Sequence, residues 1–235
     1  MSIRLPAFWA VIPAAGVGAR MAADRPKQYL QLGARTILEH SLGCFLDHPT
    51  VKGVVVSVAP DDPYWPTLAC ANDTRIQRVD GGEQRSDSVL NALLHLHEQG
   101  ADDFDWVLVH DAARPNLARD DLDNLLHELA NDAVGGLLAV PARDTLKRAD
   151  KHGRVLETVD RSVIWQAYTP QMFRLGALHR ALADSLVADA VITDEASAME
   201  WAGQAPRLIE GRADNIKVTR PEDLEWLRQR WANRR

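Results

Sequence analysis

The sequence is poor in cysteine and in long apolar runs. Its two cysteines, Cys44 and Cys70, lie far apart and no CxxC pair occurs, which argues against a disulfide framework and a structural zinc site. No apolar stretch approaches the roughly 18 residues needed to cross a bilayer. We therefore expect a protein of the reducing cytoplasm with no membrane partner.

An excess of positive charge is also lacking. Lysine and arginine number 27 against 33 aspartate and glutamate residues, which gives a formal net charge of −6. Because general nucleic-acid binders present a basic face, we expect no nucleic-acid partner. No Ser/His/Asp or Cys/His pattern surrounds a recognisable nucleophile. A small basic pocket for an anion is still compatible with this composition.

The sequence does contain short apolar runs that alternate with amphipathic segments. With 46% hydrophobic residues over 235 positions, the chain can bury the core of one large domain. The apolar runs predict buried strands at Ala7–Ile12, Gly53–Val58, Arg75–Val79, Trp106–Val109 and Gly136–Val140. Helices are predicted from a capping box of Thr36 and Glu39 to about Leu46, from a cap at Ser86 or Ser88, and over Asp120–Ala130. These repeated units predict a Rossmann-like, doubly wound α/β fold with a mostly parallel sheet.

The pattern changes after Val140. Two segments flank the turn Asp150–Gly153 and predict a β-hairpin within an excursion over residues 142–170. Later segments predict helices at Leu175–Leu186 and Asp194–Ala202, strands near Arg207–Glu210 and Ile216–Thr219, and a last helix capped by Thr219 and Glu222. We interpret residues 1–235 as a single domain into which the excursion is inserted.

The first candidate site is the small-residue loop Pro13–Met21, which directly follows the first predicted strand. It is not a dinucleotide fingerprint, because Met21 stands where a third glycine is needed, and no GK[ST] closes it as a Walker A loop. Arg20 and Lys27 make this region basic within an acidic protein. That favours a site for a multiply charged anion such as a nucleoside triphosphate. The alternative is an ordinary tight turn with solvated charges.

The second candidate site is His110–Pro115, at the carboxyl end of the predicted strand Trp106–Val109. Asp111 would lie on the rim where such sheets bind ligands, and could hold a magnesium ion that bridges phosphates. A capping role for Asp111 stays open. Arg114 could pair with a phosphate or fix the loop. His110 is better explained as a packed, hydrogen-bonded histidine than as a general base.

Three further segments carry weaker signals. Gly81–Ser88 follows a predicted strand and opens a helix, so that its N–H and hydroxyl groups would point to the same rim. Lys217, in the predicted strand Ile216–Thr219, is unusual in a buried strand unless an anion receives it. Thr158–Arg161 ends the hairpin excursion and, on its spacing alone, is better explained as a surface loop.

Together these segments resemble the family of 2-C-methyl-D-erythritol 4-phosphate cytidylyltransferases, of the non-mevalonate isoprenoid pathway. The similar stretches cover nearly the whole chain and are 13–21, 26–29, 81–88, 109–115, 143–145, 158–161, 193–196 and 210–221. The hairpin excursion together with Gly211–Lys217 is the most specific part. Glu83 departs from the pattern, since the family often has aspartate there. The resemblance implies a β-hairpin arm that clasps a second subunit, and hence a homodimer.

The resemblance also implies a reaction, in which a phosphate oxygen of methylerythritol phosphate attacks the α-phosphorus of CTP and pyrophosphate leaves. Arg20 and Lys27 would stabilise the pentacoordinate phosphate. Asp111 would hold Mg²⁺ or another divalent cation, with help from Asp214. The resemblance implies that the nucleotide is lined by Ala14, Ala15, Gly16, Gly82, Glu83, Ser88 and Ala112. It implies that the second substrate is held by Arg114, Thr145, Arg161 and Lys217, with Arg161 and Lys217 positioning its phosphate for attack.

Two rival functions stay open on the sequence. A pentitol phosphate cytidylyltransferase would perform the same chemistry on another sugar-alcohol phosphate, but segments 143–170 and 211–220 favour methylerythritol phosphate. A non-catalytic nucleotide sensor is the other rival. It would not need Arg20, Lys27, Asp111 and Lys217, because a sensor stabilises no transition-state charge.

Overall fold

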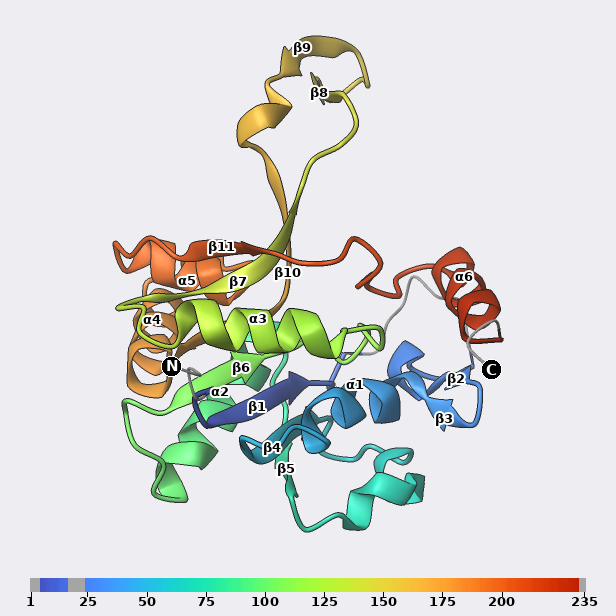
Figure 1. Ribbon diagram of the computed structural model, residues 1–235, viewed down its shortest axis with the longest axis vertical. Coiled ribbons are helices and arrows are strands. Elements are labelled where there is room, and N and C mark those ends of the chain that lie inside the picture. Colours follow the sequence, from blue (N-terminus) through green and yellow to red (C-terminus); the bar gives the residue numbers. More distant parts are fainter. Residues whose placement is uncertain (1–4, 17–23, 233–235) are drawn as a thin grey trace.

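The structure, a computed structural model, describes residues 5–16 and 24–232. In this part of the chain a seven-stranded sheet has the order β11-β7-β10-β6-β1-β4-β5 (Figure 1). Its strands are β1 (Phe8–Pro13), β4 (Val51–Val58), β5 (Ile76–Asp80), β6 (Trp106–Val109), β7 (Gly135–Pro141), β10 (Trp165–Arg174) and β11 (Arg207–Glu210). Neighbours pair in parallel, except that β10 runs antiparallel to β6 and β7. The predicted mostly parallel α/β sheet is confirmed.

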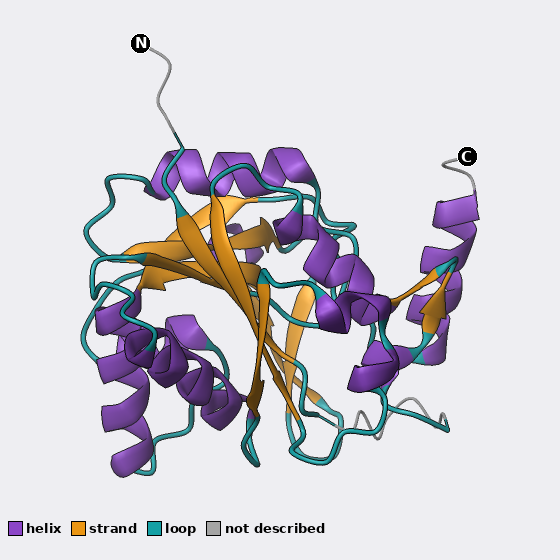
Figure 2. Ribbon diagram, turned by 90° about the horizontal axis from the view of Figure 1, so that it is seen from below, coloured by secondary structure: helices purple, strands orange, loops and turns teal. Residues whose placement is uncertain are grey.

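Helices cover both faces of this sheet (Figure 2). One face carries α1 (Ile37–Leu46) and α3 (Arg119–Leu129), and the other carries α2 (Arg85–Glu98), α4 (Leu175–Val187) and α5 (Glu195–Trp201). Along β1, Phe8 and Ile12 pack with the first pair of helices, whereas Val11 packs with the second group. A strand buried on both faces has few positions for polar residues, which is why β1 appears in the sequence as an apolar run.

The chain order opens a crevice between β1 and β6. From β1 the chain continues to β4 and β5 on one side, and then returns to β6 on the other side of β1. Where the connections from two neighbouring strands run in opposite directions, a crevice forms beyond the carboxyl ends of those strands. The loops that follow β1 and β6 are the two strongest candidate segments of the sequence analysis, so the topology itself brings them together.

Strand β10 is absent from the sequence-based prediction, which assigned residues up to 170 to the excursion. The structure corrects this, because residues 165–174 form a strand between β6 and β7. Its pairing with β7 is irregular between Ala167 and Gln171. Pro170 lies within that irregularity, where its lack of an N–H group costs no regular ladder hydrogen bond. Because of this proline and the polar residues around it, the sequence of this central strand lacks the pattern of a buried strand.

The predicted hairpin is confirmed. Strands β8 (Leu146–Ala149) and β9 (Val155–Val159) pair antiparallel and project away from the sheet and its helices, at the top of Figure 1. In the turn, Asp150 Oδ1 accepts hydrogen bonds from the N–H groups of His152 and Arg154 at 2.8 and 2.9 Å. Gly153 adopts a left-handed φ of 76°, which glycine tolerates without strain.

Two predicted helix starts have different outcomes. The capping box that opens α1 is confirmed, since Thr36 Oγ1 accepts from Glu39 N at 3.2 Å and Thr36 N donates to Glu39 Oε2 at 2.8 Å. The prediction that Ser86 or Ser88 caps α2 is wrong. The helix begins at Arg85, so both serines lie in its first turn.

The C-terminal helix α6 (Pro221–Ala232) lies beside a small hairpin of β2 (Gln31–Leu32) and β3 (Arg35–Thr36), as both views show (Figures 1 and 2). Short 3-10 helices lie at Lys27–Tyr29, Trp65–Thr67, Ala69–Asn72 and Arg161–Val163. The predicted cap of α6 is partly wrong: the N–H groups of Thr219 and Arg220 donate to Asp223, at 2.8 and 2.9 Å, and not to Glu222. The helix begins at Pro221, and this places Asp223 in its first turn.

Residues 216–219, all of them described, form no strand, which corrects another prediction. Val218 N donates to Ala113 O at 2.8 Å, but no regular ladder continues from this bond. The alternation of apolar and polar residues is genuine, because Ile216 and Val218 pack with Leu224 and Leu227 of α6. A loop lying under a helix thus imitates the two-residue period of a strand.

Candidate active site

A cavity of about 170 Å³ lies where the loops after β1, β5 and β6 meet. Most of the residues assigned to the nucleotide and to catalysis line it, although they come from distant parts of the chain. The lining includes Ala14, Ala15, Gly16, Lys27, Gly82, Glu83, Ser88, Asp111, Ala112 and Lys217. Arg20, predicted to act beside Lys27, lies outside the described residues.

The small-residue loop is held from below by Gln28. This side chain is almost fully buried, and its Nε2 donates to Ala14 O at 2.7 Å and to Gly16 O at 3.0 Å. Gln28 follows Lys27 directly, within the 3-10 helix Lys27–Tyr29. The residue that shapes the loop and the predicted catalytic lysine are therefore neighbours on one helical turn.

The turn Gly81–Ser88 touches the small-residue loop closely. A Cβ atom on Gly81 would lie 2.4 Å from Ala15 Cβ, so only glycine fits this contact. Ser88 Oγ accepts a hydrogen bond from Gly82 N at 3.1 Å and donates to Gln84 O at 3.1 Å. Ser88 thereby holds the turn in the shape that forms the cavity wall.

Asp111 is surrounded by three cations. Its Oδ1 accepts from Arg85 Nε at 3.1 Å, and its Oδ2 lies 3.2 Å from Arg114 Nε and 3.0 Å from Lys217 Nζ. Burial alone would raise the pKa of Asp111, but the charges of Arg85, Lys217 and Arg114 outweigh it and hold the pKa far below its usual value. The Asp111 side chain is therefore an ionised carboxylate on the cavity wall.

His110 supports Asp111 from behind. Thr169 Oγ1 accepts from Asp111 N at 3.1 Å and lies 3.0 Å from His110 Nδ1, while His110 Nε2 lies 2.9 Å from Arg114 O. Because Arg114 O can only accept, Nε2 carries the ring proton and Nδ1 accepts from the threonine. Burial lowers the pKa of His110 to about 4, so the ring is neutral. The sequence-based interpretation of a packed, hydrogen-bonded histidine is confirmed.

Both predicted lysines line the cavity. Lys27 Nζ donates to Val218 O at 2.9 Å, and Lys217 Nζ contacts Asp111. Lys217 belongs to the loop before α6, and not to the predicted strand. Both ammonium groups therefore occupy positions where an anion in the cavity would compete for their hydrogen bonds.

A second cavity, of about 190 Å³, shares Arg85, Asp111 and Lys217 with the first. Arg114 also lines it and is nearly buried, with its guanidinium 4.5 Å from the ring centre of Tyr168 and with Nη1 donating to Asn215 O at 2.7 Å. The shared residues form a wall between the two cavities. A phosphate that lay against this wall would be within reach of ligands in both cavities.

Three residues assigned to the site lie elsewhere. Among the described residues, Thr145 and Arg161 are not part of the lining of either cavity, and both are exposed on the hairpin arm, where Arg161 donates to Arg143 O. Asp214 is paired with Arg212 at 2.7 Å and with Arg230 at 2.5 Å, and is not part of either lining. The chain by itself thus brings together Lys27, Asp111, Arg114 and Lys217, but not these three.

Sequence reasoning assigned no role to Arg85, Gln28 or Glu195, which the structure places at or beside the cavity. Arg85 and Gln28 line it, and Glu195 is fully buried against Arg85. All three lie inside stretches that carried the family resemblance, which was the available signal. Among the described residues, no group of three or more His, Cys, Asp or Glu side chains is placed to hold a metal ion.

The chain is similar to known proteins over almost its whole length. The family model described as 2-C-methyl-D-erythritol 4-phosphate cytidylyltransferase matches residues 8–228. A protein of that name from Pseudomonas fluorescens strain Pf0-1 is 89% identical over 231 residues, which are 98% of each chain. A solved 4-diphosphocytidyl-2C-methyl-D-erythritol synthase superposes with a TM-score of 0.83 at 43% identity, covering 97% of this chain and 99% of that one. The corresponding cytidylyltransferase of Francisella tularensis superposes with a TM-score of 0.81 at 38% identity, covering 96% and 99%.

Proposed function

The chain belongs to the family of 2-C-methyl-D-erythritol 4-phosphate cytidylyltransferases, and from this premise we propose how its residues carry out the family's reaction. The enzyme transfers a cytidylyl group from CTP to 2-C-methyl-D-erythritol 4-phosphate in isoprenoid precursor biosynthesis. The products are 4-diphosphocytidyl-2-C-methyl-D-erythritol and pyrophosphate. One observation carries the assignment of residues: Lys27, Asp111 and Lys217 line a single cavity with the small-residue loop.

The nucleotide occupies the first cavity. Ala14, Ala15, Gly16, Gly82, Ser88 and Ala112 give it a wall of small groups, so that CTP meets mainly backbone. Backbone N–H groups at such turns suit phosphate oxygens and the polar edge of a base. Glu83 is exposed at the cavity rim, where its backbone can serve as well as that of aspartate.

Lys27 and Arg20 act on the reacting phosphate. When the phosphate oxygen of methylerythritol phosphate attacks the α-phosphorus, negative charge gathers on the equatorial and leaving oxygens. Lys27 gives up its bond to Val218 O and donates to those oxygens instead. No residue forms a covalent intermediate, so catalysis consists of alignment and charge stabilisation.

A divalent cation, Mg²⁺ by preference, fits this site through Asp111. Magnesium is usually held by one or two carboxylates together with substrate phosphates, so a single ionised carboxylate on the cavity wall is sufficient. When bound, the ion would neutralise charge on the triphosphate. Asp214 fits less well, because its carboxylate lies outside the lining of both cavities and away from a bound triphosphate.

The second substrate lies across the wall that the two cavities share. Lys217 and Arg114 hold its phosphate from the same chain, with Lys217 exchanging Asp111 for the phosphate. Thr145 and Arg161 belong to the arm, and they contribute to the site of a second subunit. This arrangement makes the active enzyme a homodimer.

Exposed apolar residues on the arm support the dimer. Val155 and Leu156 of β9 are each 61% exposed, and Val163 is 74% exposed. Three exposed apolar side chains within one protruding arm are unusual for a surface that stays in water. A second copy of the chain would bury them and would receive Arg161 in its cleft.

We place the enzyme in the cytoplasm. Both cysteines are free thiols, as expected in a reducing compartment. Within the described residues, no helix is both long enough and apolar enough to span a membrane.

The assignment of Asp111 is tested by Asp111→Asn, which keeps the shape of the side chain and removes its charge. We expect the Mg²⁺ concentration for half-maximal pyrophosphate release to rise by on the order of tenfold or more, because a hard cation prefers an ionised oxygen. Asp120→Asn, an exposed aspartate on α3, is the matched control. An unchanged magnesium titration would make Asp111 a purely structural residue.

Substrate choice is tested by incubating CTP with methylerythritol phosphate or with phosphorylated pentitols while pyrophosphate release is followed. We expect release with methylerythritol phosphate to exceed release with any pentitol phosphate. Equal rates would show that segments 143–170 and 211–220 do not determine the acceptor.

A further inference from the structure

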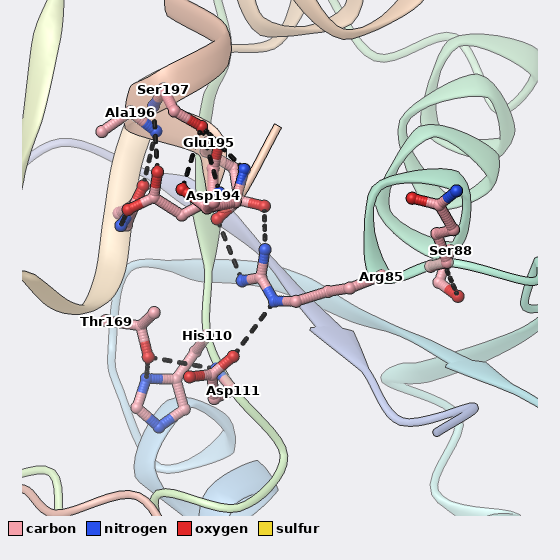
Figure 3. A network of polar contacts seen from close by, with 12 residues as sticks. Arg85, Ser88, His110, Asp111, Thr169, Asp194, Glu195, Ala196 and Ser197 are labelled. Carbon is pink, nitrogen blue, oxygen red and sulfur yellow. Dashed lines mark hydrogen bonds and ion pairs between the residues drawn. The ribbon is translucent and has the colours of Figure 1, made fainter. Parts of the chain in front are cut away.

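A chain of paired charges links helix α5 to the cavity (Figure 3). Glu195, the first residue of α5, is fully buried. Its Oε1 and Oε2 accept from Arg85 Nη1 at 2.6 Å and Nη2 at 3.0 Å, and Arg85 Nε donates to Asp111 Oδ1 at 3.1 Å. One guanidinium therefore connects two carboxylates, one of which faces the substrates.

Glu195 is held in place by the backbone around it. Gln171 of β10 donates from Nε2 to Asp194 Oδ2 at 2.8 Å and accepts at Oε1 from Ala196 N at 2.7 Å. Ser197 N donates to Asp194 Oδ1 at 3.0 Å, which caps the helix. The start of α5 is thus fixed to the central sheet. A bidentate pair with a fixed carboxylate also fixes the plane of the Arg85 guanidinium.

The charge of Glu195 matters as much as its geometry. Arg85, Arg114 and Lys217 surround Asp111 with three positive charges, and Glu195 offsets one of them. A divalent cation that approached Asp111 would be repelled by each uncompensated charge nearby. The Glu195 carboxylate is therefore placed where it reduces the repulsion between the cation and Arg85.

We propose that Glu195 and Arg85 are positioning residues for the cation site: Glu195 fixes Arg85 and offsets its charge, and Arg85 orients the Asp111 carboxylate. The proposal rests on the assignment of Asp111 as the residue that holds the divalent cation. Neither residue needs to touch a substrate to act in this way.

Glu195→Gln tests the proposal, because it keeps the shape and the hydrogen-bonding capacity of the side chain and removes its charge. We expect the apparent dissociation constant for Mn²⁺ in the presence of CTP, from the EPR signal of free Mn²⁺, to rise by about tenfold. The KM for CTP at saturating cation should stay the same or fall, since the site becomes more positive. A purely structural defect would weaken both. Glu200→Gln, an exposed glutamate on the same helix, is the matched control.

The double variant Arg85→Gln, Glu195→Gln tests whether Glu195 acts through Arg85, and it avoids leaving one buried charge alone. We expect its Mn²⁺ affinity to return to within about threefold of the wild type, because the net charge beside Asp111 is restored. Its kcat at saturating cation should be lower than that of the wild type, because the guanidinium no longer orients Asp111. A double variant that binds Mn²⁺ as weakly as Glu195→Gln would show that Glu195 acts independently of Arg85, and a wild-type kcat in the double variant would show that Arg85 does not orient Asp111.

Asp111→Asn, measured alongside, separates this proposal from the one on which it rests. If Asp111→Asn weakens Mn²⁺ binding and Glu195→Gln behaves like Glu200→Gln, the positioning role is wrong while the cation assignment stands. If Asp111→Asn leaves Mn²⁺ binding unchanged, the cation assignment itself is wrong and the positioning role is lost with it.

Discussion

Lys27 is the single residue whose proposed role gives the sharpest test. We expect Lys27→Ala to lower kcat by on the order of 10²–10³, the range for loss of one strong donor to a developing oxyanion. CTP binding should weaken less, because the extra charge that Lys27 stabilises develops only in the transition state. Steady-state kinetics and CTP titration measure the two effects. Lys52→Ala, near the start of β4 and away from the carboxyl ends of the strands, is the control. A near-normal kcat in folded Lys27→Ala would contradict the role.

His110 should make stability depend on pH. Its pKa is about 4 in the folded protein and near 6.5 in the unfolded chain, so the unfolded state binds the proton more readily between these values. The free energy of unfolding should therefore be greatest above pH 6.5 and fall toward pH 4, by up to about 3 kcal/mol from this group. Denaturant titrations of the wild type and of His110→Gln across that range measure the difference.

His152→Gln is the matched control, because this histidine is exposed on the turn of the arm. It should keep the wild-type dependence on pH, whereas His110→Gln should show a weaker one. If His110→Gln and the wild type lose stability in parallel as the pH falls, the buried ring is not the group responsible.

Some residues of the site could be predicted from the sequence and others could not. Asp111 follows a buried strand, and the carboxyl end of such a strand is where this class of fold binds ligands. Glu195 and Arg85 lie 110 positions apart, and their spacing carries no sign that they meet. Their contact depends on how α2 and α5 start at the same edge of the sheet, which only the folded structure shows.

At the scale of elements, Gly81 gives a test of the contact between the small-residue loop and the turn after β5. In Gly81→Ala the added Cβ would meet Ala15 Cβ at 2.4 Å, so one of the two segments must move away from the other. We expect the KM for CTP to rise by about tenfold or more, because small displacements of binding groups are costly.

Gly43→Ala, inside α1, is the control for this substitution. There the nearest atom to the new Cβ is Arg35 Nη1 at 3.8 Å, an ordinary contact. This variant should keep the wild-type KM and gain about 0.5–1 kcal/mol of stability, because alanine favours a helix over glycine. A Gly81→Ala enzyme with unchanged KM would show that the two segments need not touch.

Elements were predicted best where burial on both faces left an apolar run, as in β1, β4, β6 and β7. The prediction failed where the pattern of apolar residues does not reflect burial within the sheet. Strand β10 is central but contains Pro170 and polar residues beside the cavity, so that its sequence is typical of a loop. Residues 216–219 have the alternation of a strand because every second side chain packs under α6. In both cases neighbours distant in sequence decided the structure.

The whole molecule supplies the test of the arm. If Arg161 acts in the partner's cleft, Arg161→Ala and Lys27→Ala homodimers should both be nearly inactive. A mixed dimer would carry both defects in one site and leave the other intact. After full subunit exchange, activity should therefore recover to about a quarter of the wild-type value, since half of the dimers hold one intact site each.

The control is each variant put through exchange with itself, which should stay inactive. Mass spectrometry of isotopically labelled subunits shows whether exchange has occurred. If mixed dimers form and activity does not return, Arg161 serves the cleft of its own chain or does not contribute at all.

The place of β10 in the middle of the sheet also shapes how the protein is made. Strands β1, β4, β5 and β6 are the first four strands of the large sheet to be synthesised, and they can pair while the ribosome is still making the rest. Strand β7 emerges next but has no place against β6, because β10 must lie between them. The edges of β6 and β7 that face β10 therefore stay unpaired until residue 174 has left the exit tunnel, and the other edge of β7 stays unpaired until β11 follows. Over that interval the unpaired edges can pair with other strands, and we expect chaperones to bind the nascent chain most strongly then.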